Sequence, residues 1–150
     1  MALANMTQEE TNIENRNHCK RIADELLEYV RGNVYRCPEC GEACSMEEVE
    51  NENSETVYKC SCGCTTEYEP EQLYLYDWAE DILDIEYRVD NNKELRSVRV
   101  MVACGGPNIY VDTATKTVEL YWWGDRASYP ISYGVASALD DWADELWNCL

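Results

Sequence analysis

The sequence has few basic residues: 12 Lys and Arg stand against 30 Asp and Glu, which gives a formal net charge of −18. Phosphate binding needs a cationic surface, so this deficit excludes a protein that coats DNA or RNA generally. The same deficit disfavours attachment to an anionic membrane surface. We therefore expect neither direct binding of duplex DNA nor membrane association.

Histidine is almost absent, because His18 is the only one in 150 residues. A cysteine nucleophile needs a general base beside it, and a catalytic zinc usually has histidine ligands. Cys104 precedes a glycine turn, Gly105-Gly106, but His18 lies on a predicted helix far away in the sequence. We therefore interpret Cys104 as a cysteine at a strand end and predict that the protein is not an enzyme.

Long apolar runs are also missing, since no segment approaches 18 consecutive apolar residues and no membrane-spanning helix is predicted. The first ten residues lack the charged and apolar segments of a secretory signal. Together these absences predict a cytoplasmic protein. In a reducing compartment, the nine cysteines indicate metal binding rather than disulfide bonds.

Five of the cysteines form two clusters, Cys37-Pro-Glu-Cys40-Gly41 and Cys60-Ser-Cys62-Gly63-Cys64. A Cys-x-x-Cys turn followed by glycine brings two thiolates to one ion, and two such turns complete a tetrahedral zinc site. We predict one structural Zn²⁺ per chain, with four ligands: Cys37, Cys40, Cys60 and Cys62.

The two clusters resemble those of the zinc ribbon, a family built on Cys-Pro-x-Cys-Gly turns, over residues 35–68. The second cluster is one residue shorter than the usual turn, so Cys64 is the alternative fourth ligand, and Cys44 can also compete. This stretch has few large apolar residues. A structural zinc would supply the missing stability, because it contributes about 10–16 kcal/mol in small zinc-finger peptides.

Hydrophobic periodicity outside this stretch predicts an α+β fold. We expect a helix over 14–31, a zinc-ribbon module, a helical segment after Pro70, four antiparallel strands and a last helix that Ser132 caps. The strands are expected near residues 85–89, 98–102, 109–111 and 118–122, as a four-stranded antiparallel meander packed with helices. The predicted organisation is 1–33 for the N-terminal helix, 34–69 for the inserted zinc-ribbon module and 70–150 for the α+β domain.

A tryptophan pair at residues 122–123 is the most distinctive feature outside the metal site. Trp122 is expected to face the core, which sends Trp123 to the opposite face of its strand. Either another helix covers Trp123 and an Asp125–Arg126 pair holds a turn, or Trp123 belongs to a partner-binding surface with Tyr110, Asp125 and Arg126.

Charged residues follow the predicted elements. Acids are spread along the chain and include rows at 47–55, 77–90 and 140–145. These acids either serve solubility or imitate the charge of nucleic acid towards a cationic protein. We include Asp140 and Asp144, on the outward face of the last helix, in the predicted partner-binding set. The basic cluster Arg88, Arg96 and Arg99 is expected to pair with Glu86 or Glu119.

The segments 102–113 and 121–127 resemble an uncharacterised family of small accessory proteins from phages and conjugative elements. That resemblance implies a mobile-element protein that binds and inhibits a nucleic-acid-binding host defence nuclease, of the anti-CRISPR or anti-restriction type. The implied partner is a cationic nucleic-acid-binding protein. The alternative is a zinc-ribbon adaptor in transcription or DNA processing.

Overall fold

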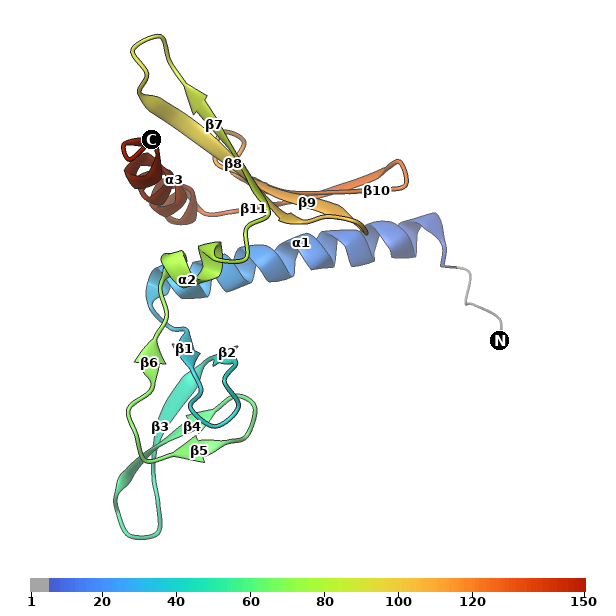
Figure 1. Cartoon of the computed structure of the whole chain (residues 1–150). Helices are drawn as coiled ribbons and strands as arrows, with labels where there is room; N and C mark the ends of the chain where they lie inside the picture. Colours follow the sequence, from blue (N-terminus) through green and yellow to red (C-terminus); the bar gives the residue numbers. More distant parts are fainter. Residues whose placement is uncertain (1–5) are drawn as a thin grey trace.

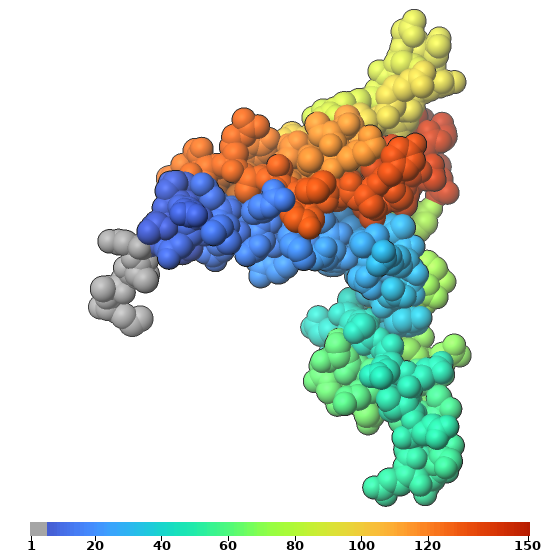
Figure 2. Space-filling view, turned by 180° about the vertical axis from the view of Figure 1, so that it is seen from behind, coloured from blue at the N-terminus to red at the C-terminus, as the bar shows by residue number. Residues whose placement is uncertain are grey.

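The computed structural model describes residues 6–150 and has the predicted α+β class. One part is an antiparallel sheet covered by helices, and the other is a cysteine-rich ribbon at the C-terminal end of the first helix (Figure 1). Seen from behind, the ribbon projects away from the rest of the molecule (Figure 2). None of the helices in the described residues is long and apolar enough to cross a membrane.

The first helix, α1 (Gln8–Arg31), begins about six residues earlier than predicted. Thr7 accepts a hydrogen bond from the Glu10 amide, and the Glu10 carboxylate accepts one from the Thr7 amide. This capping box satisfies two amides that a helix start leaves without partners. Polar residues therefore extend the helix beyond the apolar stripe on which the prediction depended.

The main sheet has five strands, one more than predicted, in the order of the chain. They are β7 (Asp84–Val89), β8 (Leu95–Ala103), β9 (Asn108–Asp112), β10 (Thr117–Trp122) and β11 (Asp125–Pro130). Asp125 and Arg126, at the start of β11, were expected in a turn or on a partner-binding surface rather than in a strand. Its apolar residues, Ala127 and Tyr129, alternate with polar ones but are few, and its last residue is a proline at a sheet edge, where no ladder hydrogen bond is lost.

Two helices, α1 and α3 (Tyr133–Trp147), cover one face of this sheet, and α2 (Leu75–Ala79) packs on both of them. Helix α1 packs on β10 and β11, and α3 packs on β8, with Ser132 as its cap as predicted. Alternate strand residues and the buried stripes of the helices form one core: Cys19, Leu26, Val98, Val100, Ile109, Val111, Val118, Leu120, Val135 and Leu139.

Two helical predictions need correction. The segment after Pro70 forms only a short helix, α2 (Leu75–Ala79), because the chain turns to enter β7. The spacing of Val135, Leu139, Trp142, Leu146 and Cys149 predicts one buried stripe on the last helix, but Leu146 and Cys149 are exposed. Cys149 follows the end of α3, and at that end Trp147 contacts the sheet instead, with its ring 5.4 Å from that of Tyr87.

The ribbon contains two small antiparallel sheets. One consists of β1 (Tyr35–Arg36), β2 (Ala43–Cys44) and β6 (Glu71–Gln72), and the other of β3 (Met46–Glu50), β4 (Thr56–Cys60) and β5 (Thr65–Thr66). The predicted hairpins are therefore present. Its buried residues Cys37, Val57 and Cys60 are not part of the main core cluster, so the ribbon has its own small interior.

Gly32 forms the joint between α1 and the ribbon. It ends the helix with a φ of 78°, a conformation that side chains rarely adopt. A Cβ at this position would lie 2.7 Å from Gln72 Nε2, which donates a hydrogen bond to the Gly32 carbonyl. The flexible end of Gln72 could move away from such a Cβ, so the joint requires glycine mainly for its left-handed backbone.

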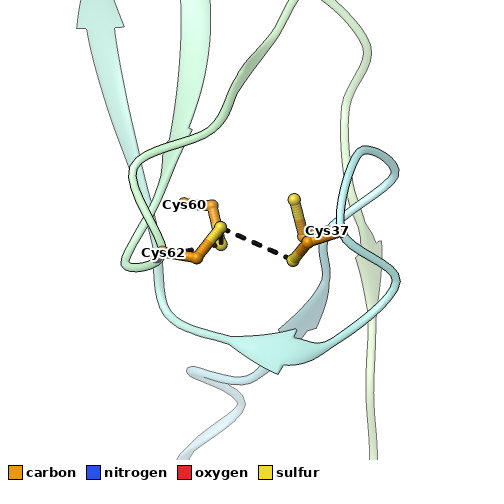
Figure 3. Close-up of side chains that lie close together, drawn as sticks. Cys37, Cys60 and Cys62 are labelled. Carbon is orange, nitrogen blue, oxygen red and sulfur yellow. Dashed lines mark hydrogen bonds between the residues drawn. The ribbon is translucent and has the colours of Figure 1, made fainter.

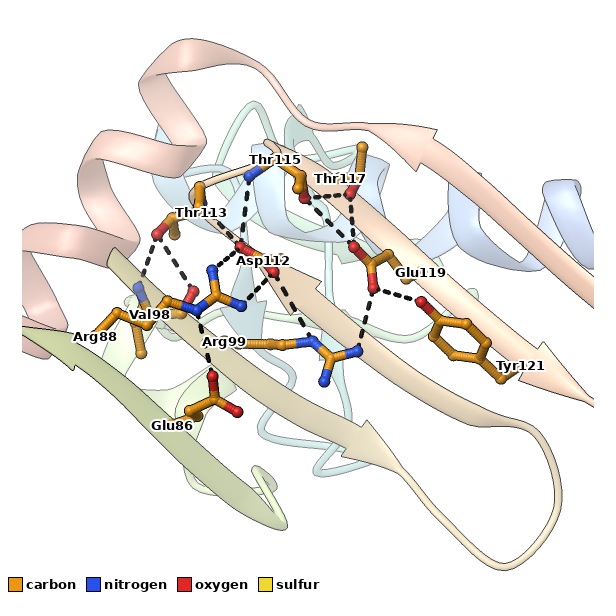
Figure 4. Close-up of polar contacts among 11 residues, drawn as sticks. Glu86, Arg88, Val98, Arg99, Asp112, Thr113, Thr115, Thr117, Glu119 and Tyr121 are labelled. Carbon is orange, nitrogen blue, oxygen red and sulfur yellow. Dashed lines mark hydrogen bonds and ion pairs between the residues drawn. The ribbon is translucent and has the colours of Figure 1, made fainter. Parts of the chain in front are cut away.

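The sheet face away from the helices carries an ion-pair network centred on Asp112 (Figure 4). Arg88 donates to both carboxylate oxygens, at 2.9 and 2.8 Å, and the Ala114 amide donates at 2.9 Å. Burial would raise the pKa of Asp112, but the hydrogen bonds from Arg88 and Ala114 outweigh it and hold the pKa below its ordinary value.

The predicted pairs form in part. Arg99 pairs with Glu119 at 3.2 Å and Arg88 also with Glu86 at 3.2 Å. Arg96 instead pairs with Asp90, at the turn before its strand. Asp112 was not singled out from the sequence, because its partners come from strands whose register only the fold defines.

Arg88→Met is expected to destabilise the fold by about 2 kcal/mol at neutral pH, because it leaves the buried Asp112 carboxylate without its main partner. The folded pKa of Asp112 is lowered, so the pair stabilises fully above the ordinary carboxyl pKa of about 4. That contribution is lost as the pH falls through the folded value. The difference in the free energy of unfolding between wild type and variant, measured by urea denaturation, should therefore shrink as the pH falls towards about 2.

Arg96→Met is the matched control. Its side chain is 64% exposed and pairs on the surface, so its loss should cost no more than about 1 kcal/mol. An equal loss of stability in the two variants would contradict the central role of the buried Asp112 in this ion-pair network.

Candidate metal centre

The four predicted zinc ligands meet at one point in the ribbon. Cys37 and Cys40 belong to the turn between β1 and β2, while Cys60 ends β4 and Cys62 follows it. Their four Sγ atoms lie within 4.8 Å of one another. Figure 3 shows Cys60 and Cys62 facing Cys37 across the gap between the two turns. The structure thus brings together all four residues chosen from the sequence.

Two glycine turns place the thiols. The Gly41 amide donates to the Cys37 carbonyl at 2.7 Å, and the Gly63 amide donates to the Cys60 carbonyl at 2.9 Å. Both glycines have positive φ, 74° and 97°, which side chains rarely adopt. The shorter second cluster therefore still forms a turn similar to the first.

Hydrogen bonding favours the thiolate form at two of the four positions. The Cys60 thiol and then the Cys64 amide lower the pKa of Cys62 to about 6. The Cys40 amide lowers the pKa of Cys37. Burial raises the pKa of Cys60 to about 12, and the pKa of Cys40 is also raised, to about 12. Thiolates are the form that binds metal, so only one thiol in each turn favours that form before a cation is bound.

Two more cysteines lie beside the four. Cys44 Sγ is 2.9 Å from Cys60 Sγ and 3.7 Å from Met46 Sδ. Cys64 is half-buried, and its carbonyl accepts a hydrogen bond from the Cys60 amide at 2.8 Å. Neither belongs to the four-sulfur group, so both remain neighbours that can compete for the ion.

The donor set suits zinc. Four thiols without a nitrogen or oxygen ligand are typical of tetrahedral structural zinc, in which no position stays open for a substrate. The ribbon has little apolar interior, as its short strands and few buried residues show. A metal ion would therefore stabilise it directly.

The predicted partner-binding residues do not form one surface. Tyr110, Trp123 and Arg126 lie on the open face of the sheet or at its β10–β11 turn. Asp140 and Asp144 belong to α3, on the opposite face, so they do not share a surface with Trp123, and their part in partner binding stays a prediction. Asp140 is also half-buried, and burial raises its pKa.

Asp125 and Arg126 do not form the expected pair in the described chain. Asp125 accepts a hydrogen bond from Gln8 of α1 at 2.9 Å. The Arg126 guanidinium lies over the ring of Tyr121, 5.4 Å from its centre. Adjacent strand residues point to opposite faces, which separates the two charges.

The fold and the site define an α+β protein with a cluster of four cysteines that could hold a metal ion. Comparisons of the chain with protein-family models, with curated proteins and with solved structures found no match.

Metal analysis should find about one zinc per chain in protein purified without chelator. Cys62→Ser should lose the metal, because it removes one of four ligands. Cys64→Ser and Cys44→Ser, which change the same chemistry beside the site, should retain it. Loss of zinc in Cys64→Ser with retention in Cys62→Ser would move the fourth ligand to Cys64.

A strong chelator should unfold the ribbon and leave the sheet and helices folded, because the two parts have separate interiors. Amide hydrogen exchange should rise over residues 35–72 and stay slow in β8 to β10. Equal deprotection of both regions would show that the ribbon is integral to the main core.

Proposed function

We propose that this protein is a non-enzymatic, zinc-binding protein that acts by binding a cationic, nucleic-acid-binding protein. Its specific form would be a mobile-element inhibitor of a host defence nuclease, of the anti-CRISPR or anti-restriction type. The contact is made through the β10–β11 turn and the adjacent open face of the sheet. The observation that carries the proposal is the position of Trp123.

Two features of Trp123 destabilise the folded chain when no partner is bound. Its side chain is 87% exposed, and its backbone has a φ of 48°. Together with Gly124, at 83°, it forms the two-residue turn between the paired residues Trp122 and Asp125. Asparagine is the usual first residue of such a turn. A strained, exposed tryptophan there is best explained by a contact with another molecule.

A row of aromatic and basic side chains continues from this turn across the open face. Arg126 lies over Tyr121, whose ring meets that of Tyr110 edge-on at 6.0 Å. The Arg99 guanidinium lies 3.7 Å from the centre of the Tyr110 ring. No helix of the described chain covers this face. Trp, Tyr and Arg are the residues that most often anchor protein interfaces.

The charge of the chain supports the class of partner. With −18 overall, long-range attraction favours a cationic protein and opposes nucleic acid. A zinc-ribbon adaptor that contacts DNA directly remains the second candidate. The ribbon offers it few basic side chains, Arg36 and Lys59, and Arg36 already donates a hydrogen bond to the Gly41 carbonyl.

Trp123→Asn separates folding from binding. Asparagine suits the left-handed turn, so the variant should be more stable, by about 1 kcal/mol or a few degrees in Tm. If Trp123 is an anchor, the same variant should inhibit a sensitive CRISPR or restriction nuclease at least about tenfold less well. Calorimetry and a nuclease titration measure the two effects.

Tyr133→Asn is the matched control, because Tyr133 is also exposed, at 77%, but belongs to α3. It should leave inhibition unchanged. Unfolding of Trp123→Asn would show that Trp123 supports the core. Tight, salt-dependent duplex binding by the wild type in a gel-shift assay would favour the adaptor instead.

A further inference from the structure

A cleft of about 240 Å³ opens between α1, the segment that follows α2 and the ends of β8 and β9. Its walls combine apolar side chains of the strands with the rings of Tyr29 and Trp78. One histidine and two carboxylates complete it: His18 and Glu25 from α1, and Asp81 from the segment before β7. None of the four clustered cysteines lines the cleft, and neither the metal centre nor the turn at Trp123 uses its residues.

Both carboxylates of this cleft lack a cationic partner. Among residues 6–150, no salt bridge or side-chain hydrogen bond includes Glu25 or Asp81. Both side chains are exposed, at the rim of the cleft, and partial burial and then the charge of Asp81 raise the pKa of Glu25. Two acids without a cationic partner therefore line the rim of one aromatic cleft.

The geometry does not suit a metal ion. Within the described chain, the ligand atoms of His18, Glu25 and Asp81 do not form a group within 4.8 Å, as the four cysteines do. An elongated cation with an apolar stem fits better, because its stem can contact the aromatic walls while its charge lies between the acids.

We propose that this cleft receives an arginine or lysine side chain of the protein partner. The inference rests on the proposed function, because it names the group by which a cationic partner would be recognised. The position agrees with that role: Ala103 lines the cleft, and Gly105, two residues further on, lines the hollow beside Trp123. One partner can therefore contact both sites around the β8–β9 turn.

The test needs no partner, since the full chain can be titrated with Nα-acetyl-arginine amide and Nα-acetyl-lysine amide. His18 is the only histidine of the chain, so its ring signal in NMR is unambiguous. We expect saturable shifts of the His18 ring and the Trp78 indole with both probes. Nα-acetyl-norleucine amide, which has the apolar stem without the charge, should bind at least tenfold more weakly.

Glu25→Gln combined with Asp81→Asn should weaken binding of the arginine probe at least tenfold. It removes a repulsion between like charges, so the fold should persist. Glu47→Gln with Glu50→Gln, on β3 of the ribbon, makes the same change of net charge and should leave binding unchanged.

Three results would overturn the inference: no saturable shift with either cationic probe, equal binding of the norleucine probe, or equal weakening by both double variants. Putrescine binding tenfold tighter than the arginine probe would assign the cleft to free polyamines instead. Failure of the probes to bind while Trp123→Asn still reduces inhibition would refute only the cleft. Probe binding without any effect of Trp123→Asn would refute only the turn.

Discussion

The packing of one long helix against one face of a five-stranded sheet organises this molecule. Residues on one stripe of α1, among them Cys19, Ala23 and Leu26, are buried against β10, β11 and the other helices. The helix extends past the sheet, and Gly32 ends it where the ribbon begins. Burial of this stripe therefore determines where the ribbon, the cleft and the open face of the sheet lie.

The ribbon shows what a short chain does when it cannot build an apolar interior. Its strands are two to five residues long, and its few buried side chains include two of the four clustered cysteines. Sulfur ligands around an ion can replace the missing hydrophobic burial. Since the site forms only in the folded ribbon, the free energy of metal binding adds to the free energy of folding. The thiols of Cys44 and Cys64 lie beside the four and can compete with them for the ion. The turns at Gly41 and Gly63 favour the four clustered cysteines as ligands.

At the β10–β11 turn, an exposed and strained tryptophan lowers the stability of the folded chain. Trp123 occupies a left-handed turn position with little contact except the edge of Trp122, at 6.0 Å between ring centres. Beside it, Tyr and Arg side chains contact one another rather than a covering layer, and the acids Glu119 and Asp112 hold them in place. Our proposals place the partner here because Trp123 is exposed at the β10–β11 turn, and because the cleft that Glu25 and Asp81 line reaches the ends of β8 and β9.

Local patterns in the sequence were sufficient for the fold class, for four of the five main strands and for the four clustered cysteines. Each depends on a short-range period or spacing: alternation in a strand, three- and four-residue steps in a helix, and Cys-x-x-Cys-Gly turns. Strand β11 was missed because its residues alternate only weakly, and the start of α1 because a polar capping box rather than an apolar stripe defines it.

The remaining features depended on contacts between distant residues. Asp112 became the partner of Arg88 only through the register of β7, β8 and β9. Asp140 and Asp144 were separated from Trp123 because α3 packs on the other face of the sheet. Glu25 and Asp81, 56 positions apart in the sequence, face one cleft only because α1 and the segment after α2 lie side by side. Spacing along the chain specifies local turns and faces, whereas packing alone decides which faces meet.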